Sequence, residues 1–249
     1  MSLLGIQRHG SGPLLVWLHG FTQTRDSAHE FRTILAGTFE VVTIDLPGHG
    51  ENSRIGASLD ATADLLAQVL PVEPFILAGY SFGARVSLHF ALSHPQRLRG
   101  LVLLGASRGI EDLQERAWRR QRDNELADRI ERIGTDRFLQ EWLAQPMFAD
   151  LPNDPSERSA RSRDPRGLAT SLRLAGTGTQ RWLGEELRTL NVPALALAGE
   201  RDAKFAKEAL ALATSVPLGA SRLISNAQHA AHLEQPEATA STIAAYHFQ

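Results

Sequence analysis

Six short apolar runs, separated by helical patterns, restrict the fold of this chain more than any other feature. The runs are continuous rather than alternating, which favours strands buried on both faces, as in a parallel sheet. Strand followed by helix, repeated along the chain, is typical of a doubly wound α/β fold. The expected strands are Leu14–Leu18, Val41–Ile44, Phe75–Ala78, Leu101–Leu104, Ala194–Ala198 and Arg222–Ile224, and the expected flanking helices are Ser27–Ala36, Leu59–Leu70, Ala84–Ser93, Glu208–Ser215 and Pro236–Tyr246.

The middle of the chain interrupts this alternation. Between Arg108 and Arg188 only helical patterns are found, and the strand rhythm resumes at Pro193. A helical block inside an α/β chain predicts a cap laid over the strand ends, so we expect a core of residues 1–107 and 189–249 and a cap of residues 108–188. Within the cap, the polar segment Asp150–Arg163 is rich in Pro, Ser and Arg and is expected to be a mobile loop. The expected cap helices are Asp112–Gly134, Thr135–Ala144 and Pro165–Thr177.

Composition excludes several classes of protein. The chain has no cysteine, which rules out a disulfide framework, a zinc ribbon and a cysteine nucleophile. Its 26 Lys and Arg residues against 28 Asp and Glu residues argue against general nucleic-acid binding. No run approaches the ~18 apolar residues of a membrane span, and the first residues lack a signal-peptide pattern. A cytoplasmic location, with no nucleic-acid or membrane partner, is therefore expected.

The pattern Gly79-Tyr80-Ser81-Phe82-Gly83 matches G-x-S-x-G. It follows an expected strand and opens an expected helix, which is the context that this motif requires. The glycines permit a sharp turn that lifts the serine hydroxyl above the sheet edge, and the first turn of the helix aims its N–H groups there. Ser81 is therefore predicted to be a nucleophilic or proton-transferring residue.

A serine of this kind needs a histidine base. His229 and His232 both lie between the last expected strand and the last expected helix. We prefer His229, because it comes first after the strand and hence lies closest to the sheet edge. His232 is expected to pack at the start of the final helix.

The histidine in turn needs an orienting acid. Asp202 follows the strand Ala194–Ala198 and is preferred to Glu200, which could instead be a solvent-exposed partner of Arg201. The order Ser81, Asp202, His229 is the chain order of the α/β-hydrolase triad.

Two other histidines are given structural roles. His19, directly after the first expected strand, is expected to hold its loop so that the Phe21 N–H points into the site, while His49 is expected to stabilise a turn. The backbone N–H groups of Phe21 and Phe82 would then form an oxyanion hole. No metal-ligand motif and no phosphate-binding loop is present, so no metal and no cofactor is expected.

Taken together, the segments WLHGF, DLPGHG, GYSFGAR, GERD and QHAAHLEQPE resemble the α/β-hydrolase superfamily over nearly the whole chain. Arg85, Gln145-Pro146 and Lys204-Phe205 further resemble the 2-succinyl-6-hydroxy-2,4-cyclohexadiene-1-carboxylate synthases of menaquinone biosynthesis. That family is a lyase family: it eliminates pyruvate from a cyclohexene bearing several carboxylates, without a cofactor. The resemblance implies a mostly parallel sheet flanked by helices, with a helical cap inserted after the sixth strand.

The resemblance also implies roles for single residues. Arg85 fits a substrate-carboxylate arginine, and its place one turn into the helix after Ser81 agrees with that role. Arg119 and Arg161 fit two further arginines in the cap, and Tyr80 and Trp142 fit aromatic walls. One departure is Gln228, since relatives usually have Gly before the catalytic histidine. Gln lacks the freedom of glycine at positive φ, so a shifted or strained loop is expected there.

The residues leave other functions open. A carboxylesterase or a C–C bond hydrolase would use the same Ser, His and Asp, and a non-catalytic ligand receptor could use the same fold. Arginine suits carboxylates better than lysine does, but the 15 arginines between positions 108 and 188 stand beside 15 acidic residues. Composition alone therefore does not show a basic cap. A monomer or weak homo-oligomer acting on a small polycarboxylate is expected.

Overall fold

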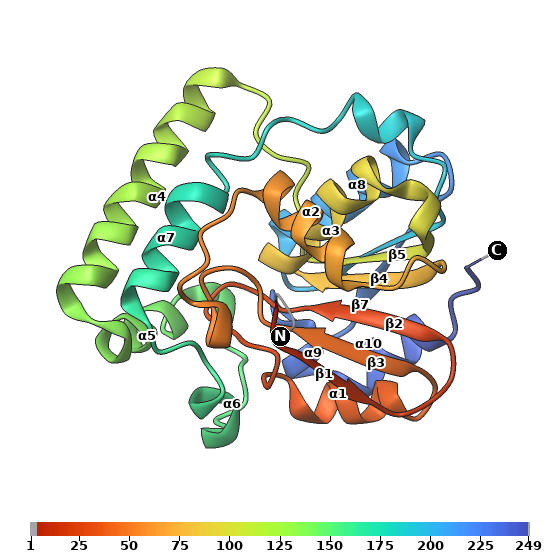
Figure 1. The fold of residues 1–249 in the computed structure, drawn as a ribbon, viewed down its shortest axis with the longest axis horizontal. Coiled ribbons are helices and arrows are strands. Elements are labelled where there is room, and N and C mark those ends of the chain that lie inside the picture. Colours follow the sequence, from red (N-terminus) through yellow and green to blue (C-terminus); the bar gives the residue numbers. More distant parts are fainter. Residues whose placement is uncertain (1–3, 249) are drawn as a thin grey trace.

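Seven strands form one sheet in the computed structural model, which describes residues 4–248 (Figure 1). Their order is β1-β3-β2-β4-β5-β6-β7, and every neighbouring pair is parallel except β1 with β3. All six expected strands form, so the doubly wound α/β prediction is confirmed. The strands are β1 (Ile6–His9), β2 (Leu14–Leu18), β3 (Glu40–Ile44), β4 (Phe75–Tyr80), β5 (Leu98–Leu104), β6 (Ala194–Gly199) and β7 (Gly219–Ile224).

The pattern of apolar runs did not reveal β1. This strand has four residues, half of them exposed, and it pairs only with β3 at the edge of the sheet. The inner strands β2, β4 and β6 are buried almost throughout, which is why their sequences are continuously apolar.

Helices cover both faces of the sheet (Figure 1). One apolar core lies between the sheet and α2, α3 and α8, and a second lies between the sheet and α1 and α10. No helix in the described part of the chain has the length and apolar character needed to cross a membrane. The flanking helices are α1 (His29–Ala36), α2 (Leu59–Val69), α3 (Phe82–Ser93), α8 (Ala203–Ser215), α9 (Ala231–Glu234) and α10 (Pro236–Ala244), and 3₁₀ turns are found at Gly50–Asn52, Pro95–Arg97, Pro146–Phe148 and Glu186–Thr189.

The segment between β5 and β6 forms a helical block beside the sheet (Figure 1). Helices α4 and α7 pack against each other around a small core that includes Ile130, Phe138 and Leu168. Five strands precede this block among the described residues, one fewer than the family resemblance implied. The helices are α4 (Leu113–Ile133), α5 (Thr135–Leu143), α6 (Pro155–Ser159) and α7 (Pro165–Ala175). The domain boundaries at residues 107 and 188 stay a prediction.

The segment Asp150–Arg163 was expected to be a mobile loop, and it is helical in part, while its mobility stays a prediction. It contains helix α6 and is hydrogen-bonded to the loop after β2. The Thr24 hydroxyl donates to the Ala160 carbonyl at 2.5 Å, and the Ser162 N–H donates to the Thr22 carbonyl at 2.8 Å. The sequence shows the polar composition of this segment but not these distant partners.

The backbone of α3 at Gly83 lies very close to the backbone of β2 at Leu18, and this contact predicts the effect of a substitution on stability. A Cβ on Gly83 would lie 2.2 Å from the carbonyl oxygen of Leu18, which the backbone of β2 fixes in place. We expect Gly83→Ala to lower the free energy of unfolding by about 3 kcal/mol or more, because neither backbone can move away. Gly37→Ala is the control: its backbone has φ −69° and ψ −17°, which alanine adopts without strain, and an added Cβ would come no closer than 3.2 Å to the Ile34 carbonyl oxygen, so it should cost less than about 1 kcal/mol. Urea unfolding measures both, and equal losses would contradict the steric account.

Candidate active site

Ser81 lies at the turn between β4 and α3. Its backbone has φ 50° and ψ −101°, a conformation that side-chain-bearing residues rarely adopt. Gly79 and Gly83 allow this turn, since a Cβ on Gly79 would lie 2.5 Å from the carbonyl carbon of Gly83. The turn places the Ser81 hydroxyl at the carboxyl edge of the sheet, as the motif predicted.

Ser81, His229 and Asp202 form one hydrogen-bonded chain. The Ser81 Oγ lies 3.1 Å from His229 Nε2, and His229 Nδ1 lies 2.8 Å from Asp202 Oδ2. The second carboxylate oxygen of Asp202 accepts a hydrogen bond from the Phe205 N–H at the start of α8, which fixes its direction. His229 is 3% exposed, and a Cβ on Gly105 would lie 2.9 Å from its ring. The three predicted residues therefore meet in the geometry that proton transfer between serine and histidine requires.

The Phe21 and Phe82 N–H groups lie in the two loops beside Ser81. Phe82 is the first residue of α3, where an amide has no partner within the helix. Within residues 4–248, no acceptor is found for the N–H of Phe21 or of Phe82. Both amides can therefore bind an anion at this edge of the sheet.

His19 and His49 hold the loop that carries Phe21. The Nε2 of His19 accepts from the Leu46 N–H at 3.0 Å, and the Nε2 of His49 accepts from the Thr22 N–H at 3.3 Å. Both rings are buried and contact each other at 5.0 Å between centroids. These contacts agree with the structural roles expected for the two histidines.

Burial of these rings predicts a pH dependence of stability. Desolvation lowers the pKa of His19 to about 4 and that of His49 to about 3. Below pH 6.5 the unfolded chain binds protons that the folded chain rejects, so stability present above this pH is lost as the pH falls. We expect the free energy of unfolding to drop by about 1.4 kcal/mol per pH unit for each histidine between pH 6.5 and 4. Urea midpoints from pH 7.5 to 4.5 test this, and a flat profile would contradict it.

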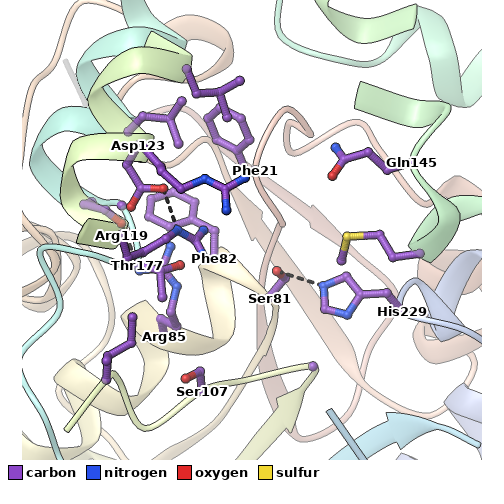
Figure 2. A pocket seen from close by; sticks show the side chains of 18 of the residues that line it. Phe21, Ser81, Phe82, Arg85, Ser107, Arg119, Asp123, Gln145, Thr177 and His229 are labelled. Atoms are coloured by element: carbon purple, nitrogen blue, oxygen red, sulfur yellow. Dashed lines mark hydrogen bonds and ion pairs between the residues drawn. The ribbon is translucent and has the colours of Figure 1, made fainter. Parts of the chain in front are cut away.

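A cavity of about 1340 Å³ opens between the carboxyl edge of the sheet and the helical block. Figure 2 shows Ser81 in the middle, His229 on one side, and Arg85 and Arg119 on the other. Gln145, Met147 and Phe148 from the helical block also line it. The cavity thus presents a serine–histidine pair to one end of a ligand and guanidinium groups to the other.

Arg85 is a partly buried cation that lines this cavity. Its Nη1 donates to the Ala175 carbonyl at 2.9 Å, and its guanidinium lies 5.5 Å from the Phe82 ring centroid. No carboxylate among the described residues forms an ion pair with it. Burial, with repulsion from Arg119, lowers the pKa of Arg85 to about 10. The nearby Asp123 carboxylate acts in the opposite direction but forms no ion pair with it. A partly buried cation of this kind would gain from an anionic ligand.

Three further predicted residues line the same cavity. Arg119 does so with its Nε bonded to Asp123 Oδ1 at 2.8 Å, and its side chain is 37% exposed. Tyr80 is buried against the His229 and His232 rings, and Trp142 is half-buried against Phe21.

Arg161 does not line the cavity, which corrects its expected placement. Its guanidinium lies behind the loop after β2, where Nη1 donates to the Thr22 hydroxyl at 2.7 Å and Nη2 contacts Glu157 at 3.3 Å. The sequence placed Arg161 in the segment expected to form the cap but could not show which way its side chain points.

Two smaller expectations about nearby loops are wrong. Gln228 is not among the described residues with positive φ, so the expected strain before His229 is absent. Arg201 pairs with Asp150 at 3.0 Å, not with Glu200, which instead accepts from the Asn226 N–H at 3.3 Å. His232, by contrast, packs in α9 at the start of the C-terminal helices, as expected.

Lys204 and Phe205 also line the cavity, and they were not predicted as site residues. The Phe205 ring packs 4.4 Å from the His229 ring, and the Lys204 ammonium lies 5.3 Å from the Phe205 ring centroid. Their place directly after Asp202 is the signal that could have identified them. No group of three or more potential metal-ligating side chains occurs in the described part of the chain.

A family model described as the alpha/beta hydrolase family matches residues 15–242. The chain belongs to this family. It is 35% identical over 248 residues to the 2-succinyl-6-hydroxy-2,4-cyclohexadiene-1-carboxylate synthase of Yersinia pestis bv. Antiqua (strain Nepal516), covering 95% of this chain and 88% of that protein. The synthase of the same name from Yersinia pseudotuberculosis serotype O:1b (strain IP 31758) is 34% identical over 249 residues, with the same coverage.

Comparison with solved structures agrees with these sequence relatives. The structure of MenH from S. aureus superposes with a TM-score of 0.89 at 30% identity, covering 98% of this chain and 97% of that one. A thermophilic esterase from Thermogutta terrifontis, solved with malate bound, gives a TM-score of 0.82 at 26% identity, covering 96% and 91%. Within the alpha/beta hydrolases, the chain therefore belongs with the synthases.

Proposed function

We propose that the protein is a 2-succinyl-6-hydroxy-2,4-cyclohexadiene-1-carboxylate synthase of menaquinone biosynthesis. It is a lyase that eliminates pyruvate from 2-succinyl-5-enolpyruvyl-6-hydroxy-3-cyclohexene-1-carboxylate. The observation that carries this proposal is Arg85, a partly buried guanidinium that forms no ion pair within the described residues and lines the same cavity as Ser81 and His229. The relatives of the same name support it.

In the proposed mechanism the serine acts as a base. His229, oriented by Asp202, takes the Ser81 proton, and the Ser81 oxygen takes a proton from a ring carbon of the substrate. The electron pair of that C–H bond forms the new ring double bond, and the C–O bond to the enolpyruvyl group breaks. The leaving enolate takes the proton held by His229 and becomes pyruvate. No acyl-enzyme is formed.

Negative charge develops on the substrate when the ring proton leaves. The Phe21 and Phe82 N–H groups are the proposed hydrogen-bond donors to the substrate oxygen that gains this charge, since neither N–H has an acceptor within the described chain. One lost donor of this type typically costs about 10²–10³-fold in rate. His19 and His49 keep the loop of Phe21 in place.

The substrate carboxylates are assigned to the guanidinium side of the cavity. Arg85 and Arg119 are the proposed carboxylate contacts, and Tyr80 and Trp142 the proposed walls. Arg161 is assigned instead to the loop after β2, because its head group is occupied by Thr22 and Glu157. Arg119 keeps its Asp123 partner but lines the cavity, whereas Arg161 is not among the lining residues, and this difference in position gives the arginines different roles.

Pyruvate release tests the proposal. The purified protein would be supplied with the substrate generated in situ by the preceding enzyme, and pyruvate would be measured against the spontaneous elimination. We expect release far above this background, with one pyruvate for each cyclohexadiene formed. A rate equal to the background would overturn the proposal.

A serine carboxylesterase is the second candidate, and two observations favour it. The same Ser81–His229–Asp202 chain suits attack on an ester carbonyl, and the Thermogutta terrifontis esterase shares the fold. Such an enzyme for neutral esters would gain nothing from the Arg85 guanidinium in its cavity, which is why the lyase is preferred.

A further inference from the structure

The loop that carries His229 is held on one side by the loop that carries Asp202. The Ala227 carbonyl accepts from the Arg201 N–H at 2.9 Å. A Cβ on Gly199 would lie 2.0 Å from the Gln228 carbonyl oxygen, so only glycine permits this approach. Asn226 turns the chain with φ 58°, and its side-chain oxygen accepts from Arg201 at 2.9 Å. The carbonyl side of the loop is thereby fixed.

The amide side of the same loop is held by one carboxylate. Glu234 Oε2 accepts a hydrogen bond from the Gln228 N–H, and Glu234 Oε1 accepts one from the Ala230 N–H at 3.0 Å. These two residues flank His229 directly. Glu234 ends helix α9, whose N–H groups at Leu233 and Glu234 both donate to the Ala230 carbonyl. The loop and the helix after it therefore close on each other around the histidine.

We infer that Glu234 is a positioning residue for His229, acting through both backbone amides that flank it. The inference rests on the proposed role of His229 as the base that activates Ser81. His229 Nε2 is 3.1 Å from Ser81 Oγ, so a small displacement of its backbone would lengthen a catalytic hydrogen bond. Misplacement of a reacting group by ~1 Å can cost ~10²-fold in rate.

The surroundings of Glu234 do not suit a purely stabilising role. The carboxylate is half-buried, and burial, aided by the nearby Asp150 and Asp202 carboxylates, raises its pKa. The two amide hydrogen bonds act in the opposite direction but do not outweigh burial. Keeping a charged carboxylate here therefore costs folding free energy, which is consistent with a gain in the geometry of the site.

Glu234→Gln tests this inference. Glutamine has the same shape but offers one acceptor oxygen, and its amide nitrogen would face one of the two N–H groups. We expect kcat for pyruvate release to fall about 10- to 100-fold, with KM within twofold. Labelling of Ser81 by a fluorophosphonate probe should slow by a similar factor, while the urea midpoint stays equal or rises. Glu234→Asp, which keeps the charge on a shorter arm, should recover part of kcat, and it also serves if Glu234→Gln fails to fold.

Glu237→Gln is the matched control, because Glu237 is exposed three residues further along, in the first turn of α10. It should leave kcat, labelling and stability unchanged. Wild-type kcat and labelling rate in Glu234→Gln, or a loss confined to KM or to stability, would overturn the inference. Labelling by the fluorophosphonate probe distinguishes failure of this inference from failure of the proposed function. A wild-type protein that labels but releases no pyruvate contradicts the lyase, while the labelling rates still decide the role of Glu234.

Discussion

Replacing Ser81 by alanine is expected to lower kcat for pyruvate elimination by about 10³-fold or more, with KM within twofold. In the proposed mechanism the Ser81 oxygen, which is hydrogen-bonded to His229 Nε2, takes the ring proton, so its removal takes away the group that abstracts this proton. General-base catalysis supplies about 10²–10⁴-fold, and this sets the size of the effect. Steady-state pyruvate release measures it, and activity near that of the wild type would contradict the mechanism.

Ser171→Ala is the control for this substitution. Ser171 lines the same cavity with a buried hydroxyl that lacks a hydrogen-bond partner, so its loss should leave kcat unchanged. Ser81→Gly adds a second check, because glycine adopts φ 50° without strain. It should be as inactive as Ser81→Ala but more stable than the wild type by about 1 kcal/mol. A less stable Ser81→Gly would contradict the strained turn.

Replacing Arg85 by methionine is expected to raise KM by about 10²-fold or more, with a smaller effect on kcat. The guanidinium is partly buried and forms no ion pair in the described chain, so a substrate carboxylate is the group that would neutralise it. Truncating one partner of a buried charge pair costs 2–5 kcal/mol or more, which is consistent with this change in KM. Because burial already lowers the pKa of Arg85, its loss should change the free energy of unfolding by no more than about 1–2 kcal/mol.

Two further variants show whether the effect on KM depends on the charge of Arg85, on the shape of its guanidinium, or only on having an arginine in the cavity. Arg85→Lys keeps a positive charge but loses the planar, two-pronged donor, so KM should lie between those of the wild type and Arg85→Met. Arg122→Met removes an exposed arginine that stacks on Trp118 at the mouth of the same cavity, and KM should change less than threefold. An unchanged KM in Arg85→Met would exclude it as a carboxylate contact.

The proposed catalytic residues were predictable because each follows a strand with a recognisable pattern. Parallel strands bring their carboxyl ends to one edge, so Ser81 after β4, Asp202 after β6 and His229 after β7 had to meet there. The role of the two glycines in G-x-S-x-G could also be predicted, because they leave room for a sharp turn. The structure agrees: a Cβ on Gly79 would lie 2.5 Å from the carbonyl carbon of Gly83.

The direction of cap side chains could not be predicted in the same way. Arg119 lies on α4, where a helical pattern fixes a face only to about one residue, and Arg161 lies in the bend between α6 and α7, where no periodicity applies. Arg119 lines the cavity, whereas Arg161 lies behind the loop after β2. The anchoring of the segment Asp150–Arg163 depends on bonds to residues more than a hundred positions away. Such partners leave no local trace in the sequence.

Glu234 belongs to the same class. A glutamate after a histidine loop has no pattern that distinguishes it from a solvated side chain, and only the fold shows that its two oxygens accept the amides on either side of His229. Gln228 has no positive φ, and its carbonyl oxygen would lie 2.0 Å from a Cβ on Gly199, a contact between two distant loops that the sequence does not show.

The central claim is that the serine–histidine pair serves elimination rather than hydrolysis. The most direct measurement compares kcat/KM for pyruvate release with kcat/KM for hydrolysis of a p-nitrophenyl ester by the same preparation. We predict rapid pyruvate release far above the spontaneous rate, with feeble ester hydrolysis, and a loss of the former in Arg85→Met. Rapid ester hydrolysis without acceleration of pyruvate release would contradict the account and identify the protein as an esterase of the same fold.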